Sequence, residues 1–385
     1  EEQLNVDRVL WHMAVSSVLS NRDTYYGKNI KNYYLYRHRD SLWHVMPWDV
    51  NECLGGVMGG TTNEAALYDV LQWLDPPEPN RPLVWQILSQ ERYFKQYFAH
   101  IRTVLEESYS VEEIASQVAE IQALIEQAVL EAPFGRFPVD GLQDNVEFDM
   151  TYPDLVWLSS FSGILPTMDV RLEYLSGHPE VVKVPPTLMN VARSIPEPEE
   201  GQDVWVTAEV ANATEVDVLI TTNEHYASHF VPFEMHDDGL SQDGLAGDGV
   251  YGALVPFQNE GNRVQYYVRA QNEDAMVLEP RRAEYEFFEY TVGAADPGTG
   301  LDEIVAANEV LGLYPNPAQD VVSYSCNAEG LVAIRIFDLT GAMVGQLSPS
   351  SSQRISVAHL CDGMYIVSCT AKNGREWREV LIKGK

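Results

Sequence analysis

The sequence predicts a multidomain protein in which an α-rich module with one β-hairpin is followed by two all-β sandwich modules. Hydrophobic residues recur at helical spacing through the first 180 or so residues. The period changes to two after a stretch rich in proline and glutamate at 184–202. A linker-like stretch at 293–309, rich in glycine, proline and alanine, separates this region from a second region that also alternates. The last two modules are therefore predicted to be β-structure.

The length of 385 residues supports this division, because it exceeds what one ordinary hydrophobic core accommodates. Hydrophobic residues make up 45% of the chain, which is enough for each module to fold. The expected domains are 1–185, 186–292 and 310–385, with a linker at 293–309.

Helices in the first module are predicted from apolar spacing and caps. Behind the capping residue Asn5, the segment 5–20 carries apolar residues at helical spacing: Val6, Val9, Leu10 and Met13. A longer helix at 92–110 places four residues on one face: Phe94, Phe98, Ile101 and Leu105. The next helix begins at a capping box formed by Ser110 and Glu113.

Strands in the two later modules are predicted from strict alternation between glycine, asparagine and aspartate turns. The middle module has such segments at 203–210, 215–222, 263–270 and 283–292. The last module has them at 320–326, 331–338, 354–360 and 364–371. Short strands at this density predict β-sandwiches.

The net charge of −32, from 57 acidic and 25 basic residues, excludes nucleic acid and anionic membranes as expected partners. No apolar run approaches the length of a transmembrane segment, and no signal peptide is evident at the start, so we expect that an export signal lies elsewhere or has been removed. The chain has four cysteines, and their spacing is not that of a metal site: Cys53, Cys326, Cys361 and Cys369. The sequence does not decide whether two of those in the last module form a disulfide.

The stretch 21–56 is the candidate for chemistry. Residues 32–37 and 42–48 form a hairpin, and cross-strand indices that sum to about 79 or 80 place Asn32 near Asp49. Asp23 enters the same end of the hairpin from the first helix. Two carboxylates and a carboxamide suit a magnesium-bound phosphate. Spacing alone nevertheless favours the simpler interpretation, in which Asp23 caps a turn and Asp49 ends a strand, because Asp is common at loop positions.

The segment NYYLYRHRDSLWHVMPWDVNECLGG at 32–56 resembles the signature of the CotH kinase family of atypical secreted kinases. The residues that carry the resemblance are Tyr33, Tyr34, Leu35, Tyr36, Pro47, Trp48, Asp49 and Gly55. The resemblance implies that residues 1–185 form the C-terminal part of a kinase-like domain, a C-lobe that uses ATP and Mg²⁺ or Mn²⁺. No phosphate-covering loop precedes the hairpin, so we expect that an N-terminal part is missing or that the site is a remnant.

The same resemblance assigns roles to individual residues. Asp23 would be the catalytic or substrate-orienting carboxylate, while Asn32 and Asp49 would hold the nucleotide and its metal. Asn51 stands where the family usually has a second acidic residue. It would offer Mg²⁺ a neutral oxygen, which predicts weaker metal binding.

The middle module contains three neighbouring histidines: His225, His229 and His236. We interpret them as surface residues, because their spacing is not the H-E-x-x-H of a zinc metalloprotease. An acidic, glycine-rich loop follows them and is a candidate for Ca²⁺, with Asp-Gly turns as the alternative: Asp237, Asp238, Asp243 and Asp248. The loop resembles those of immunoglobulin-like modules that follow secreted catalytic domains, which implies a spacer or an accessory module.

The last module resembles the type A C-terminal sorting domain of the type IX secretion system of Bacteroidota. Its distinctive segments are Y-P-N-P at 314–317 and G-M-Y-I at 363–366. The resemblance implies a secreted or outer-cell-surface location and the type IX secretion machinery as a partner.

These observations lead to one functional expectation and one alternative. The expected function is an exported cell-surface kinase that transfers phosphate from ATP to Ser or Thr of an extracellular protein. The alternative is a non-catalytic adhesion or scaffold protein with a degenerate kinase-like domain. A hydrolase has little support, because neither G-x-S-x-G nor H-E-x-x-H occurs.

Overall fold

The computed structural model describes residues 3–27, 30–38, 41–56, 60–72, 74, 79–131, 140–152, 160–222, 230–256, 258–294, 311–325, 331–338, 342–348, 353–372 and 376–384. Contacts divide the chain into two compact units, Glu1–Ala294 and Ala295–Lys385. Almost all of the predicted linker at 293–309 lies outside the described residues.

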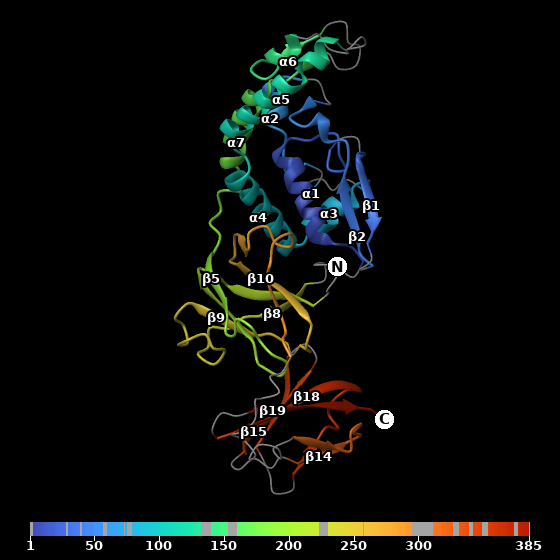
Figure 1. Ribbon diagram of the computed structural model, residues 1–385, viewed down its shortest axis with the longest axis vertical. Helices are drawn as coiled ribbons and strands as arrows, with labels where there is room; N and C mark the ends of the chain where they lie inside the picture. The colour runs from blue at the N-terminus through green and yellow to red at the C-terminus, as the bar shows by residue number, and fades with distance from the viewer. Residues whose placement is uncertain are drawn as a thin grey trace. The chain divides into compact units, whose positions relative to one another are not determined.

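The first unit begins with a helical part whose described residues also form two small two-stranded sheets, β1-β2 and β3-β4 (Figure 1). Its helices are α1 (Val6–Val18), α2 (Thr62–Ala66), α3 (Pro82–Leu88), α4 (Glu91–Glu107), α5 (Val111–Glu131), α6 (Asp140–Asp144) and α7 (Ile164–Ser176). The short elements are β1 (Tyr33–Arg37), β2 (Trp43–Pro47), the 3₁₀ helix η1 (Val50–Glu52), β3 (Met150–Thr151) and β4 (Ser160–Phe161). Helix α1 contacts both α4 and β2, so it forms the centre of this part.

Helix α1 confirms the prediction made from its cap and spacing. The side chain of Asn5 accepts a hydrogen bond from the backbone N–H of Arg8 at 2.9 Å, which satisfies one of the free donors at the helix start. The predicted apolar positions are buried in the main core of this part: Val6, Val9, Leu10 and Met13.

The hairpin also has the predicted register. Tyr33 pairs with Pro47 and Arg37 pairs with Trp43, so the indices of paired residues sum to 80. Residues 39 and 40, in the turn of the hairpin, lie outside the described residues. This register places the start of β1 beside the end of β2, where the candidate site lies.

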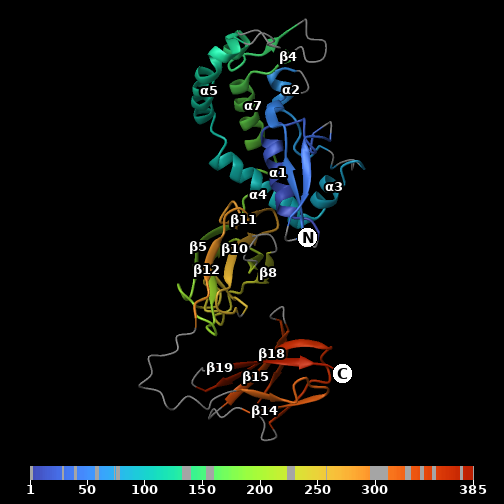
Figure 2. The same ribbon diagram turned by 45° about the vertical axis from the view of Figure 1, so that its right-hand side comes forward.

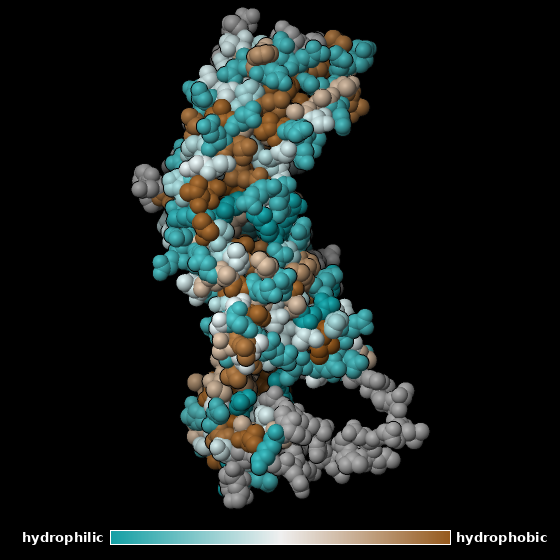
Figure 3. Space-filling model, turned by 90° about the vertical axis from the view of Figure 1, so that its left-hand side faces the viewer, coloured by the Kyte–Doolittle hydropathy of each residue, from teal (hydrophilic) through white to brown (hydrophobic). Residues whose placement is uncertain are grey.

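Helix α5 is unlike α4 because none of its residues is buried. It begins at the predicted cap, where Ser110 Oγ accepts a hydrogen bond from the N–H of Glu113 at 3.2 Å. Figure 3, viewed from the side on which α5 and α7 lie in Figure 1, shows hydrophobic residues on this face of the helical part. Although α5 has 21 residues, no helix among the described residues combines the length and the hydropathy needed to cross a membrane.

The remainder of the first unit is a two-sheet β-structure. Its strands are β5 (Thr187–Arg193), β6 (Trp205–Ala211), β7 (Glu215–Thr221), β8 (Val231–Glu234), β9 (Val250–Leu254), β10 (Arg263–Gln271), β11 (Met276–Glu279) and β12 (Phe288–Thr291). The strand orders are β5-β6-β9 and β11-β10-β7-β8, with β12 also paired to β10. Val206, Val218 and Val268 are among the fully buried residues between the sheets, so the predicted β-sandwich is confirmed.

One predicted strand is shorter than expected. The alternating segment 283–292 becomes a strand only at β12, while residues 281–285 form turns. The reason is a set of tertiary contacts: Arg282 Nε lies 2.9 Å from Glu107 of α4, and Trp11 of α1 donates to the carbonyl of Ala283 at 3.1 Å. These contacts hold the segment 281–286 against the helices instead of extending β12.

The helical part and the β-sandwich pack together within the first unit. Lys95 of α4 donates to the carbonyl of Asn272 at 2.8 Å, and Arg102 donates to that of Met276 at 3.0 Å. Ala99 of the same helix packs in a buried apolar cluster with Leu278 and neighbouring residues. Helix α4 therefore presents a mixed polar and apolar face to β11.

The second unit contains two antiparallel sheets (Figure 2). Its strands are β13 (Gly312–Tyr314), β14 (Val321–Ser325), β15 (Leu331–Asp338), β16 (Met343–Leu347), β17 (Arg354–Ser356), β18 (Gly363–Ala371) and β19 (Glu376–Lys383). The orders are β13-β14-β17 and β16-β15-β18-β19, which confirms a second all-β module. Cys53 and Cys361 are free thiols, Cys369 is buried, and Cys326 lies outside the described residues.

Arg171 of α7 makes a contribution to stability that can be measured. Its buried guanidinium donates to the carbonyls of Ser17, Ala66 and Tyr68, which joins the end of α1 to the end of α2 and the turn after it. Arg171→Met leaves these carbonyls without their donor, and we expect it to lower the free energy of unfolding by about 3 kcal/mol.

Urea unfolding followed by near-ultraviolet circular dichroism measures this loss. Arg263→Met is the matched control, because Arg263 forms an exposed pair with Glu289 and its loss should cost less than about 1 kcal/mol. An equal effect of the two substitutions would contradict the role given to Arg171.

Candidate functional site

The structure brings Asp23 and Asn32 into direct contact. The Nδ2 group of Asn32 donates to the backbone carbonyl of Asp23 and to its Oδ2, each at 2.8 Å. The carbonyl of Asn32 in turn accepts from the N–H of Trp48 at 3.0 Å, which ties the same residue to the end of β2. Asn32 therefore joins the loop after α1 to the open end of the hairpin.

Three residues around this contact have left-handed backbone conformations. The φ angles are +50° at Ile30, +56° at Asn32 and +50° at Asp49. Asparagine and aspartate tolerate this region, but a β-branched residue such as Ile30 rarely adopts it. Strained backbone of this kind gathers at binding and catalytic sites, where the surrounding structure holds it in place.

Asp49 lies at the surface between β2 and η1. The residue is exposed, its side chain does not cap η1, and it accepts no hydrogen bond from the described residues. Asn51 is also exposed, on η1 itself. The buried and hydrogen-bonded carboxylate of Asp23 and the free carboxylate of Asp49 therefore differ sharply in environment.

Lys31 is the residue of this site that the sequence analysis missed. Its Nζ lies 2.8 Å from Oδ2 of Asp23, whose side chain is 3% exposed, while that of Lys31 is 51% exposed. The hydrogen bond to Asp23 raises the pKa of Lys31, and the charges of Asp23, Asp49 and Glu52 act in the same direction. A lysine adjacent to Asn32 in a strongly acidic chain was the available signal.

The donor atoms of this site suit a Mg²⁺ ion that also binds phosphate. Asp49 supplies an uncommitted carboxylate, and Oδ1 of Asn32 accepts no hydrogen bond from the described residues. Both are hard oxygen donors, and Mg²⁺ in phosphotransfer sites takes one or two such ligands and completes its shell with water and phosphate. The described residues contain no group of three acidic, histidine or cysteine side chains that would hold a metal alone.

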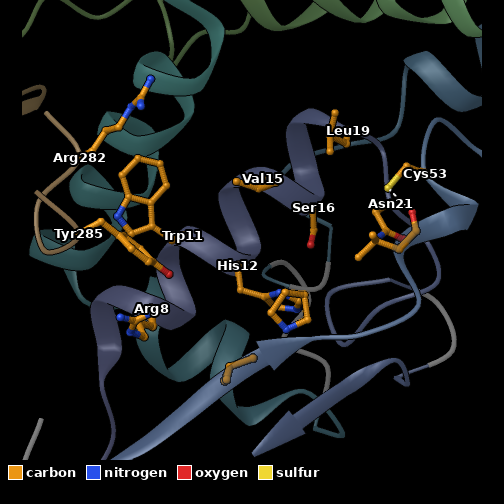
Figure 4. A pocket seen from close by; sticks show the side chains of 13 residues that line it. Arg8, Trp11, His12, Val15, Ser16, Leu19, Asn21, Cys53, Arg282 and Tyr285 are labelled. Carbon is orange, nitrogen blue, oxygen red and sulfur yellow. Dashed lines mark hydrogen bonds between the residues drawn. The ribbon is translucent and has the colours of Figure 1, made fainter. Parts of the chain in front are cut away.

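A groove of about 340 Å³ runs along α1 beside this site (Figure 4). It is lined by Arg8, Trp11, His12, Val15, Ser16, Leu19, Asn21, Val45, Pro47, Val50, Cys53, Arg282 and Tyr285. Figure 4 shows Arg8, Trp11 and Tyr285 together at one end and Asn21 with Cys53 at the other. Asn21 also accepts a hydrogen bond from the N–H of Asp23 at 3.1 Å, so the groove reaches the candidate site.

The acidic loop of the middle module uses its carboxylates to hold its own backbone. Buried Asp243 accepts hydrogen bonds from the N–H groups of Gly239 and Ser241 at 2.7 and 2.8 Å. Burial alone would raise its pKa, but these donors outweigh that effect and lower it. Asp237, Asp238 and Asp248 accept comparable bonds from loop N–H groups. Calcium binding here stays a prediction.

The histidines that precede this loop add no further site. His225 and His229 lie outside the described residues. The ring of His236 is half-exposed, and its Nδ1 lies 3.8 Å from a carboxylate oxygen of Glu234.

Comparison with family models finds three matches along the chain. Residues 1–144 match the family described as CotH kinase protein, and residues 206–276 match the one described as conditioned medium factor second Ig-like domain. Residues 312–383 match the one described as secretion system C-terminal sorting domain. The chain therefore contains, in this order, segments similar to CotH kinase proteins, to an Ig-like domain and to a secretion sorting domain, which confirms the resemblances seen in the sequence.

Comparison with curated proteins finds no match. Among solved structures, the chain is similar to BhCBM56, studied as a bromine derivative, with 15% identity over 26% of this chain and 88% of that chain and a TM-score of 0.19. It is also similar to fibronectin(III)-like modules of Clostridium thermocellum CbhA, with 10% identity over 50% and 94% of the two chains and a TM-score of 0.17. These scores are too low to support an argument.

His12 of α1 gives this region a measurable pH dependence. Its Nε2 lies 2.9 Å from Oγ1 of Thr24, and burial lowers its pKa from 6.5 to about 4. Between these pH values the imidazole is neutral in the folded protein and protonated in the unfolded chain, so proton binding favours unfolding. His12 therefore removes up to about 3 kcal/mol of stability as the pH falls from 6.5 to 4.

The free energy of unfolding measured from pH 8 to pH 4 tests this expectation. His12→Gln cannot be protonated, so the variant should lose less stability than the wild-type protein over the lower part of the range. Parallel curves for the two proteins would show that His12 is not the titrating group.

Proposed function

We propose that this protein is an exported cell-surface kinase that transfers phosphate from ATP to Ser or Thr of an extracellular protein. The sorting-domain match implies handling by a type IX secretion system, and the CotH kinase match covers the part that contains the candidate site. The observation that carries the proposal is that Asn32 orients the buried carboxylate of Asp23 and is also bonded to Trp48, whose neighbour in the sequence is the exposed Asp49.

In this proposal Asn32 and Asp49 hold the metal of a magnesium-bound ATP through Oδ1 and a carboxylate oxygen. The metal, when bound, neutralises charge on the phosphates and fixes their orientation. Asn32 has a second role because its Nδ2 group fixes the carboxylate of Asp23 at 2.8 Å. One carboxamide thus sets the spacing between the metal and the orienting carboxylate.

Asp23 is suited to orienting the hydroxyl group of an acceptor. Its side chain is 3% exposed and is held by Asn32 and Lys31, so it has little rotational freedom to lose when a substrate binds. Lys31 is half-exposed and can move away from Oδ2 toward a phosphate oxygen, which would open the carboxylate to the acceptor. The same residue then keeps a positive charge beside the transferred group.

An exposed aromatic face on the hairpin lies next to these residues and supports nucleotide binding. Tyr34 and Trp48 are more than half exposed, and their rings contact edge to face with centroids 5.5 Å apart. Tyr36 and Met46 extend the same face of the hairpin and are also exposed. A flat apolar face beside a phosphate site provides a stacking surface for a nucleobase.

A non-catalytic surface protein is the second candidate, and two features of the site favour it. Asn51 offers no charge where the family usually has an acidic residue, which weakens metal binding. Lys31 also occupies Oδ2 of Asp23 in the structure, as expected of a site that has become a structural ion pair. This candidate predicts no affinity for ATP.

Substitution of the two carboxylates distinguishes these candidates. In the protein isolated from the cells that make it, Asp49→Asn should weaken the binding of magnesium-bound ATP at least tenfold, because it removes the charged metal ligand. Asp23→Asn should leave that affinity within about threefold and lower the rate of phosphate transfer at least a hundredfold. Calorimetric titration and incorporation of labelled phosphate measure the two effects.

Asp169→Asn is the matched control, since Asp169 is an exposed aspartate on α7 outside the site. It should change neither quantity. Wild-type protein that binds no nucleotide, or two site variants that bind it as well as the control, would rule out the kinase proposal.

A further inference from the structure

One side of α1 faces a groove, and most of the residues on that side are only partly exposed. The residues of α1 and its C-cap that line the groove recur at helical spacing: Arg8, Trp11, His12, Val15 and Leu19. Eleven residues separate the first from the last, which corresponds to about 16 Å along the helix axis. The segment from β2 to η1 forms one wall through Pro47 and Val50, and the turn 281–286 forms the other.

The size and shape of this groove suit a short extended peptide. An extended chain rises about 3.3 Å per residue, so a length of about 16 Å accommodates about five residues. The volume of about 340 Å³ is at the lower end of the range for ligand sites. Trp11 and Val15 form an apolar floor, and Val15 is 38% exposed.

The charge of the groove is opposite to that of the chain as a whole. None of the thirteen described residues that line it is acidic, although the protein carries a net charge of −32. Arg8 forms no ion pair with the described residues, and its guanidinium lies over the ring of Tyr285 at 4.4 Å. Arg282 is shared with Glu107 at 2.9 Å and with Glu286 at 3.7 Å, so Arg8 is the uncommitted positive charge.

We propose that this groove binds an extended segment of the acceptor protein that carries acidic residues followed by apolar ones. The acidic residues would pair with Arg8, and the apolar ones would lie on Trp11 and Val15. The far end of the groove is at Asn21, whose side chain holds the N–H of Asp23, so the bound segment leads toward the candidate phosphotransfer site. The choice of an acceptor as occupant rests on the proposed kinase function.

Selectivity follows from the surrounding charge. The acidic surface of the rest of the protein repels an acidic segment. The end of the groove at Arg8 is positively charged and borders apolar surface, so it is the place where such a segment binds. A basic segment lacks a carboxylate to pair with Arg8 and gains nothing from this groove. Discrimination between acidic and basic peptides is therefore the property to measure.

The test uses two fluorescein-labelled peptide pools and the full chain. One pool has two glutamates followed by four positions occupied by Leu, Val, Phe or Ser, and the other has two lysines in place of the glutamates. Fluorescence anisotropy should show saturable binding of the glutamate pool in the micromolar to millimolar range, and at least tenfold weaker binding of the lysine pool. No nucleotide is added, so the result does not depend on phosphate transfer.

Three variants locate the binding. Arg8→Glu should weaken the binding of the glutamate pool at least tenfold, and Val15→Asp should do so at an exposed position where folding is not at risk. Arg37→Glu makes the same change of charge on the exposed strand β1, outside the groove, and should change binding less than twofold.

Each outcome bears on the groove separately from the kinase proposal. If Arg8→Glu and Val15→Asp both lose binding of the glutamate pool, the peptide groove is supported. This holds even if the protein has no affinity for ATP, a result that would rule out only the kinase proposal. Equal binding of the two pools, no binding at millimolar peptide, or equal effects of Arg8→Glu and Arg37→Glu would overturn the inference.

Discussion

Helix α1 is fixed at both ends by buried polar groups, and the candidate site and the groove both depend on its position. At the first end, the carboxylate of Asp7 lies 2.8 Å from Nε2 of the buried His100. At the other end, the carbonyl of Ser17 accepts from Arg171, and its hydroxyl lies 2.7 Å from that of Tyr97. Buried groups of this kind are costly to separate, so the helix has one position in the core.

This constraint carries over to the chemistry. The loop that contains Asp23 begins directly after α1, and Asn32 then connects that loop to the hairpin. The turn 281–286 of the β-sandwich is held to the same helix by the hydrogen bond from Trp11 to Ala283. The β-sandwich is therefore a structural part of the surface beside the candidate site, because it supplies one wall of the groove.

Local rules in the sequence predicted those features that depend on neighbouring residues. The cap at Asn5 and the hairpin register that brings Asn32 to Trp48, the residue before Asp49, follow from short-range spacing, and both are found in the structure. The turn at 281–286 was interpreted as part of a strand because Tyr285 and the residues after it alternate as strand residues do. Contacts with Glu107 and Trp11, far away in the sequence, override that pattern.

The candidate site shows the same division. Asp23, Asn32 and Asp49 could be singled out because a hairpin has few registers, but Lys31 could not, because its pairing with Asp23 and the left-handed backbone at Ile30 and Asn32 on either side of it are not visible in residue spacing. The groove was missed for a related reason. Its floor on α1 and its two walls come from three segments that meet only in the folded chain, and no single motif contains them.

The most direct test of the central claim is to locate a metal ion in crystals of the protein grown with Mn²⁺ and a non-hydrolysable ATP analogue. Mn²⁺ takes the same oxygen ligands as Mg²⁺ and is identified by its anomalous scattering. Our account predicts a manganese peak bound by Asp49 and by Oδ1 of Asn32, with the phosphates beside Asp23. Crystals that contain the analogue with manganese elsewhere, or crystals that bind neither, would contradict the assignment of this site to phosphate transfer.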